Sequence, residues 1–271
     1  MNDVTILESF ILGKRKDQEL NEDGLIITDD YIAVIDGASN ATDFKGLPGG
    51  LLAKDILVNG ILNLKNTVSG FEAIKSLNAL LNQAQKDYPE AKNNPAKRLM
   101  ASILIYSIKD KQIWSYGDCK WMINKNEYQF NKKIDELNAQ VRSFVNQAEM
   151  RLGKSKEELL DSDAGAIYIY KLLNYQPLFA NQNNEFGYPI LDGFELNGDF
   201  FTSIDVKSND IIILATDGYP QLRSSLEESE NILGEVLEKD PLLIESNRTV
   251  KGFYNNLNSY DDRTYIKFVV N

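Results

Sequence analysis

The sequence predicts an α+β protein with mainly antiparallel sheet. Short β-rich runs gather near both ends of the chain and in its middle, and helical segments lie in pairs between them. This order lacks the regular strand–helix–strand alternation of a doubly wound parallel sheet. No repeat, low-complexity tract or clear linker interrupts the 271 residues, so we expect a single domain spanning residues 1–271.

Runs rich in β-branched and aromatic residues, many with alternating polarity, are expected to be strands. In chain order they are residues 5–12, 24–28, 31–35, 101–107, 112–116, 120–124, 200–206, 211–215 and 264–270. The second and third runs are separated only by Asp29-Asp30, and this spacing predicts an antiparallel hairpin. Residues 211–215 are continuously apolar, as in a fully buried strand.

Apolar residues at three- and four-residue spacing predict the helices. The expected helices are residues 51–64, a segment from about residue 70, residues 134–152 with Gly153 as C-cap, a shorter segment from residue 155, and residues 225–239. Three of them begin with the spacing of a capping box, at Ser69 and Glu72, Ser155 and Glu158, and Ser225 and Glu228. The Asn-, Gly- and Pro-rich residues 174–198 are expected to be mostly loop, and so is the stretch from Pro89 to Pro95.

The charge balance argues against nucleic acid or membrane as a partner. Apolar residues make up 43% of the chain and charged residues 25%, which is ordinary for a globular protein, and the net charge is −11. An acidic protein is not attracted to phosphate backbones or anionic lipid. The longest apolar runs are too short for a membrane span. The first residues lack a basic segment followed by an apolar one, so we expect no signal peptide and a cytoplasmic location.

The chain contains no histidine and one cysteine, Cys119. Histidine acid–base catalysis, histidine metal sites and Ser-His or Cys-His pairs are therefore excluded. A cysteine phosphatase needs an arginine six positions after its cysteine, and Lys125 stands there. An intrachain disulfide is also excluded. Any chemistry must rest on carboxylates, lysines, arginines, tyrosines, serines, threonines, Cys119 or a bound metal.

Carboxylates occur at the ends of several expected strands. The pairs are Glu22-Asp23, Asp36-Gly37, Gly117-Asp118, Asp217-Gly218 and Asp261-Asp262. One Asp-Gly pair alone is most often a turn. Several acidic groups at the edges of core strands repel one another and need a compensating cation. Hard divalent ions such as Mg²⁺ or Mn²⁺ take oxygen ligands, so the pattern favours a metal site.

Five short motifs in order resemble those of the metal-dependent protein phosphatase family, type 2C or PPM, and a divergent, bacterial-like member in particular. They are NED at residues 21–23, VIDG at 34–37, GDCK at 117–120, ATDG at 215–218 and DDRTYI at 261–266. Gly49-Gly50 before LLAKDIL also resembles the family's opening of its first long helix. The resemblance implies two stacked antiparallel β-sheets flanked by helices, with a metal site at one edge.

The resemblance also implies the site residues and the reaction. The implied metal ligands are Asp36, Gly37 through its carbonyl, Asp118, Asp217, Asp261 and, through water, Glu22, with Asp23 behind them. Asp36 would bridge two Mn²⁺ or Mg²⁺ ions, Asp217 and Asp261 would hold the first, and Asp118 would join Asp217 at a third ion. The metals activate a water for in-line attack on a phosphomonoester. The implied substrates are phosphoserine and phosphothreonine in proteins.

Two positions depart from the family's pattern. Ala38 stands where many members have a histidine, and Gln18 stands where the phosphate-binding arginine is usual. Arg15 is the nearest replacement. Lys14 or Lys16 would serve as point charges without the bidentate fork of a guanidinium.

Two questions stay open on the sequence alone. Because of these departures, two other functions stay open. The chain could be a regulatory or binding relative without catalysis, or a phosphatase for small phosphorylated metabolites. Residues 131–160 are expected to form a helical insertion, which is either a cover or docking element for substrate or an ordinary amphipathic helix packed on the sheets. The sequence does not predict the oligomeric state.

Overall fold

The computed structural model describes residues 3–39, 43–44 and 46–271. The strands are β1 (Val4–Leu12), β2 (Asp23–Ile27), β3 (Tyr31–Gly37), β4 (Asp43–Phe44), β5 (Leu47–Pro48), β6 (Ala101–Ser107), β7 (Gln112–Tyr116), β8 (Lys120–Ile123), β9 (Asn126–Tyr128), β10 (Thr202–Asp205), β11 (Ile211–Ala215) and β12 (Arg263–Val270). The helices are α1 (Gly49–Leu62), α2 (Gly70–Gln85), α3 (Pro89–Asn93), α4 (Lys133–Arg151), α5 (Lys156–Asp161), α6 (Ala164–Tyr175) and α7 (Leu226–Lys239).

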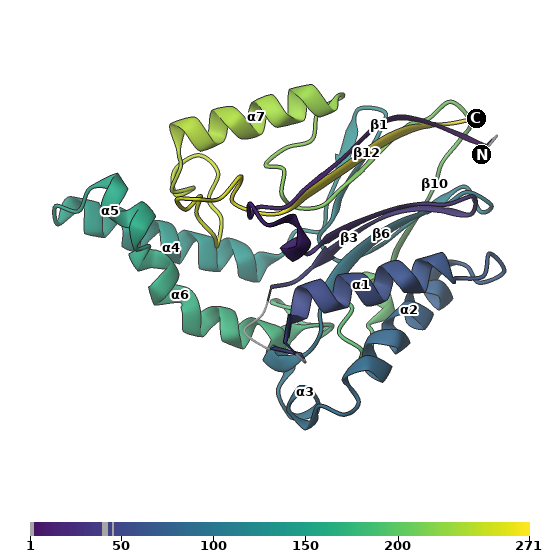
Figure 1. The fold of residues 1–271 in the computed structure, drawn as a ribbon, viewed down its shortest axis with the longest axis horizontal. Coiled ribbons are helices and arrows are strands. Elements are labelled where there is room, and N and C mark those ends of the chain that lie inside the picture. Colours follow the sequence, from purple (N-terminus) through teal and green to yellow (C-terminus); the bar gives the residue numbers. More distant parts are fainter. Residues whose placement is uncertain (1–2, 40–42, 45) are drawn as a thin grey trace.

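The main strands form two five-stranded antiparallel sheets that stack on each other. One sheet has the order β1-β12-β11-β8-β9 and the other the order β10-β7-β6-β3-β2. Helices α1 and α2 cover the outer face of the β3–β6 sheet, and α7 lies over the outer face of the β1–β12 sheet (Figure 1). Helices α4, α5 and α6 extend away from the sheets on one side (Figure 1). The predicted architecture of two stacked antiparallel sheets flanked by helices is confirmed.

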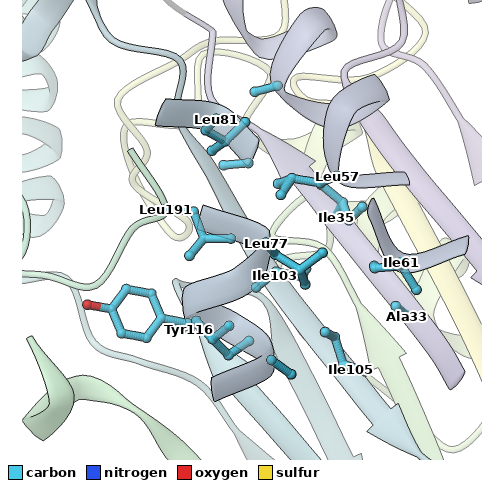
Figure 2. Packing of buried hydrophobic residues seen from close by; sticks show 14 of the residues in the cluster. Ala33, Ile35, Leu57, Ile61, Leu77, Leu81, Ile103, Ile105, Tyr116 and Leu191 are labelled. Atoms are coloured by element: carbon cyan, nitrogen blue, oxygen red, sulfur yellow. The ribbon is translucent and has the colours of Figure 1, made fainter. Parts of the chain in front are cut away.

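Strand β3 is buried on both faces, which explains its continuous apolar run. Val34 lies in the cluster between the two sheets, with Leu104 of β6 and Leu214 of β11. Ala33 and Ile35 face the opposite way, toward α1 and α2 (Figure 2). Because side chains alternate along a strand, the next residue after Ile35 projects toward the space between the sheets.

Most of the predicted elements form, with shifts of one or two residues at their ends. The predicted hairpin is β2 and β3. Ser155 caps α5 in a capping box, and Ser225 accepts a hydrogen bond from the Glu228 amide at the start of α7. Ser69 is the N-cap residue of α2, but the predicted capping box is wrong, because the Ser69 side chain makes no capping hydrogen bond and Glu72 pairs with Lys75.

Two helices lie where the sequence did not predict them. The segment around Pro89 contains the short helix α3, which begins at that proline. Helical structure also continues past residue 160 into α6, with the Asp163 side chain accepting a hydrogen bond from the Ala166 amide at its N-terminus. Exposed Ile167 and Tyr168 on α6 obscure its amphipathic pattern. No helix in the described parts of the chain is long and apolar enough to cross a membrane.

Candidate active site

Four of the predicted carboxylates line one cavity of about 590 Å³. Asp36 lies at the end of β3, Asp118 lies in the turn between β7 and β8, Asp217 follows β11, and Asp261 precedes β12. The cavity wall also includes Gly37 and Ala38, and α4 and α6 contribute to its opposite side. Segments far apart in the sequence therefore bring their acidic groups to one place.

Strand pairing explains why these groups meet. Strands β11 and β12 are antiparallel neighbours, so the residues after β11 lie beside the residues before β12. Asp217 and Asp261 are in these two positions. In the other sheet, β3 pairs with β6, and Asp36 lies opposite Ser102, whose hydroxyl hydrogen-bonds to Asp118.

The glycines after Asp36 and Asp217 permit close backbone contacts. A Cβ on Gly37 would lie 2.2 Å from the Gly50 carbonyl oxygen, and a Cβ on Gly218 would lie 2.1 Å from the Asp262 carbonyl oxygen. Any larger residue would force these backbones apart. The first Asp-Gly pair therefore does not make a turn: both of its residues belong to β3.

Asp23 lies behind the cavity and joins the two sheets. Its carboxylate accepts hydrogen bonds from Thr216 Oγ1 at 2.6 Å and Thr264 Oγ1 at 2.8 Å. Burial raises its pKa well above the usual value, although the two hydroxyls oppose the shift. Asp23 thus links β2 to the ends of β11 and β12, where Asp217 and Asp261 are attached.

Two lysines neutralise the Asp261 side of the cavity. Lys14 Nζ lies 2.9 Å from Asp261 Oδ1, 3.3 Å from Asp262 Oδ2 and 3.5 Å from Glu22 Oε2. Lys251 Nζ forms an ion pair with the other oxygen, Asp261 Oδ2. Burial opposes ionisation, but Lys251 and then Lys14 hold the pKa of Asp261 at about 2.

Asp36 and Asp217 form no ion pair with a described residue, and the charges of Lys251 and Lys120 offset the raised pKa of Asp217 only in part. Burial, followed by the charge of Asp217, raises the pKa of Asp36 well above its usual value. Burial, followed by the charges of Asp261 and Asp118, raises the pKa of Asp217 to about 7. Burial also acts on Asp118, but Lys132 at 3.2 Å outweighs it and lowers the pKa of that carboxyl. The repulsion between Asp36 and Asp217 is what a bound cation would relieve.

The donor set fits a hard divalent ion. Asp36, Asp118 and Asp217 supply oxygen atoms to one cavity, and Asp36 and Asp217 form no ion pair with a described residue. In the part of the chain that the structure describes, no three acidic or cysteine side chains already stand close enough to hold one ion. A bound ion would therefore need the carboxylates of the cavity to move closer together.

Like Asp23, two further predicted residues, Glu22 and Arg15, lie outside the cavity wall. Glu22 is buried, and its Oε2 atom contacts Lys14 Nζ and accepts a hydrogen bond from Ser39 Oγ. The Arg15 guanidinium donates to the Leu20 carbonyl at 3.3 Å. Neither side chain is among the described residues that line the cavity.

Comparisons with known proteins identify the fold. No protein-family model matches the chain, and no curated protein sequence does. The catalytic domain of the serine/threonine protein phosphatase PstP, solved with two manganese ions, matches with a TM-score of 0.51 and 13% identity over 99% of this chain and 98% of that one. Stp1, a serine/threonine phosphatase of Staphylococcus aureus, also has a TM-score of 0.51 and 13% identity, over 98% and 96% of the two chains. The chain has the fold of these phosphatases.

Several residues of the cavity wall were not predicted from the sequence as site residues. Lys132, Arg248 and Lys251 line the cavity beside the carboxylates. Lys132 precedes α4, and the other two lie in the long loop between α7 and β12. None of them belongs to a motif, and only tertiary structure brings them to the site.

The raised pKa values predict that the metal-free phosphatase fold loses stability as the pH rises from 5.5 to 8. Unfolded Asp217 titrates near 3.8 and folded Asp217 near 7, so the folded state binds more protons between these values. Its contribution is complete below pH 4 and is lost as the pH rises through 7, with a total magnitude on the order of 4 kcal/mol. Asp118 and Asp261 have lowered pKa values, so their contributions stay constant over this range.

Thermal unfolding in a metal chelator, measured from pH 5.5 to 8, tests this expectation. Asp217→Asn should flatten the pH dependence, whereas Asp87→Asn, at an exposed position on α2's C-terminal side, should leave it unchanged. A melting temperature that rises with pH in the wild-type chain would contradict the prediction.

Proposed function

We propose that the chain is a Mn²⁺- or Mg²⁺-dependent phosphatase that hydrolyses phosphomonoesters, with phosphoserine and phosphothreonine in proteins as its substrates. The observation that carries the proposal is the cavity in which Asp36, Asp118, Asp217 and Asp261 meet at the ends of strands. The fold shared with PstP, which was solved with two manganese ions, supports it. The proposed location is the cytoplasm.

The proposal assigns the metal to Asp36 and Asp217, which have no ion-pair partner among the described residues, and to Asp118, which has one partner, Lys132. Asp36, Asp217 and Asp118 would hold divalent ions together with the Gly37 carbonyl. Bound ions of this kind lower the pKa of water and neutralise phosphoryl oxygens. The chain's own groups fix the ligands in place: Lys120 Nζ donates to the carbonyls of Tyr219 and Pro220, which holds the backbone just after Asp217.

Phosphate recognition is assigned to Arg248. Among the basic groups of the cavity wall, Lys132 is held by Asp118 and Asp135, and Lys251 is held by Asp261. The exposed Arg248 guanidinium makes no hydrogen bond or ion pair with any described residue. A free guanidinium can bind two phosphoryl oxygens at once. Its place on the wall makes it a better candidate than Arg15.

Turnover of p-nitrophenyl phosphate with and without Mn²⁺ tests the proposed function. We expect turnover that depends on added Mn²⁺ and stops in chelator. Absence of metal-stimulated turnover, together with no Mn²⁺ binding by calorimetry, would contradict the proposal and favour the alternative of a non-catalytic relative. Phosphopeptides compared with sugar phosphates separate a protein phosphatase from a phosphatase for small metabolites.

Arg248→Ala is expected to reduce kcat/KM for p-nitrophenyl phosphate by about 10- to 100-fold, mostly through KM. The reason is the loss of a charge-assisted contact worth about 1.5 to 3 kcal/mol. The matched control is Arg15→Ala, which removes the same charge outside the cavity and is expected to change kcat/KM by less than about threefold. Equal losses in the two variants would reject the assignment to Arg248.

A further inference from the structure

The Asp261 carboxylate is fully occupied by the chain's own cations. Lys14, which follows β1, lies 2.9 Å from Oδ1, and Lys251, in the loop before β12, pairs with Oδ2. The Asp262 amide also donates to Oδ1 at 3.0 Å. Each oxygen thus has a charged donor, and these two donors come from opposite ends of the sequence.

Asp36 and Asp217 differ from Asp261 in this respect. Among the described residues, no lysine or arginine forms an ion pair with either of them, although they line the same cavity. The cavity therefore has one side where the carboxylate is paired directly with lysines and one side where the carboxylates have no ion-pair partner, although the charges of Lys251 and Lys120 act on Asp217. A divalent ion gains most where the acidic groups lack a partner, because it need not displace an ammonium group.

The two lysines differ in how firmly they are held. Lys14 is buried, and it contacts Glu22 and Asp262 in addition to Asp261. The Lys251 side chain is 41% exposed, and Asp261 is its one ion-pair partner among the described residues. Lys14 is therefore a fixed part of the site, and Lys251 is the cation whose removal would expose Asp261 to metal.

We propose that Lys14 and Lys251 act as internal cations for Asp261, so that divalent metal in this cavity is held by Asp36 and Asp217, which have no ion-pair partner among the described residues, without Asp261. The inference rests on the proposed metal-dependent function, and it changes the ligand set that the sequence resemblance implied. Lys251 pairs with Asp261 Oδ2, so an ion held by that oxygen would have to displace its ammonium group. Removing the Lys251 charge should open that position.

Calorimetric titration with Mn²⁺, supported by the paramagnetic resonance signal of free Mn²⁺, tests the inference on the full chain. Asp217→Asn is expected to weaken binding at least about tenfold. The charge-balanced double variant Asp261→Asn/Lys251→Met is expected to keep the wild-type number of ions, with a Kd within about threefold. Lys251→Met alone is expected to bind one more ion, or to bind Mn²⁺ at least about tenfold more tightly. Lys207→Met, at an exposed position away from the cavity, is the control and should bind as the wild type does.

The outcomes separate this inference from the proposed function. If the double variant loses Mn²⁺ as severely as Asp217→Asn, or if Lys251→Met leaves binding unchanged, the inference fails while a metal-dependent phosphatase stands. If the wild type binds no Mn²⁺ but Lys251→Met does, Lys251 shields Asp261, but the proposed metal site without Asp261 and the proposed function of the native chain both fail. If no variant binds Mn²⁺, both fail. Thermal unfolding of each variant confirms that a loss of binding does not come from loss of the fold.

Discussion

Asp217→Asn is expected to lower Mn²⁺-stimulated turnover of p-nitrophenyl phosphate by at least roughly 100-fold. The substitution keeps the size of the side chain and removes the negative charge that lies against Asp36 in the cavity. A neutral amide is a much weaker ligand for a hard divalent ion than a carboxylate. Turnover is measured at saturating Mn²⁺, and again over a range of Mn²⁺ concentrations to detect weakened binding.

The same variant should be more stable than the wild type when metal is absent. Asp217 is ionised at pH 8 in a site where burial and like charges raise its pKa to about 7, so its neutral replacement relieves repulsion. A gain in melting temperature of roughly 5 °C in chelator at pH 8 is expected. The combination of lost activity and gained stability distinguishes removal of a metal ligand from general damage to the fold. Activity that survives the substitution would reject the assigned site.

The carboxylate cluster could be predicted from the sequence because its members stand at the ends of apolar runs that have the pattern of strands. Asp36 and Asp217 each end an apolar run, and Asp261 precedes another, so all three were expected at an edge of the sheets. Antiparallel pairing of β11 with β12 then brings Asp217 and Asp261 together without any further signal. Local patterns were sufficient here because these carboxylates lie at the ends of regular strands or within two residues of them.

The basic side of the cavity could not be predicted in the same way. Arg248 and Lys251 lie in a loop, where neither helical nor strand periodicity relates sequence position to direction. Arg15 was favoured because it lies close to the NED motif in the sequence, yet its guanidinium turns to the Leu20 carbonyl. Proximity along the chain is a poor guide where a loop reverses direction, and long-range contacts decide which cation reaches the site.

The boundary of the helical insertion was missed for a related reason. Residues 161–165 contain polar and small residues that are typical of a loop, and the sequence therefore gave no continuation beyond residue 160. In the structure Asp163 caps α6 and at the same time binds a buried arginine of α4. Asp163 therefore caps α6 and links it to α4 through Arg142. The composition of residues 161–165 does not reveal this role.

Arg142 joins this helical segment to the loop that carries Arg248 and Lys251. Its fully buried guanidinium binds Asp163 through Nε at 2.9 Å and through Nη2 at 2.5 Å. It also donates to main-chain carbonyls of the loop, at 2.7 Å to Leu242, 3.3 Å to Leu243 and 3.0 Å to Thr249. Because the last of these carbonyls is next to Arg248, the guanidinium fixes the backbone from which the proposed phosphate ligand projects.

Arg142→Met is expected to lower the free energy of unfolding by about 3 to 5 kcal/mol, because it leaves the buried Asp163 carboxylate without its cation. The expected fall in melting temperature is roughly 10 °C. Arg151→Met, at an exposed position on the same helix, is the matched control and should change stability by less than about 0.5 kcal/mol. Equal losses for the two arginines would show that the buried ion pair contributes nothing particular to the fold.

A double-mutant cycle with Asp163→Asn separates the pair from its surroundings. The combined variant Arg142→Met/Asp163→Asn should cost less than the sum of the two single variants, since each single change strands one buried partner. We also expect Arg142→Met to raise KM for p-nitrophenyl phosphate in the same direction as Arg248→Ala, at a temperature where both variants are folded. A stability loss with unchanged KM would make the helical segment an ordinary packed element. A rise in KM would make it part of the substrate-binding wall, because the loop positions Arg248 only while Arg142 holds the loop.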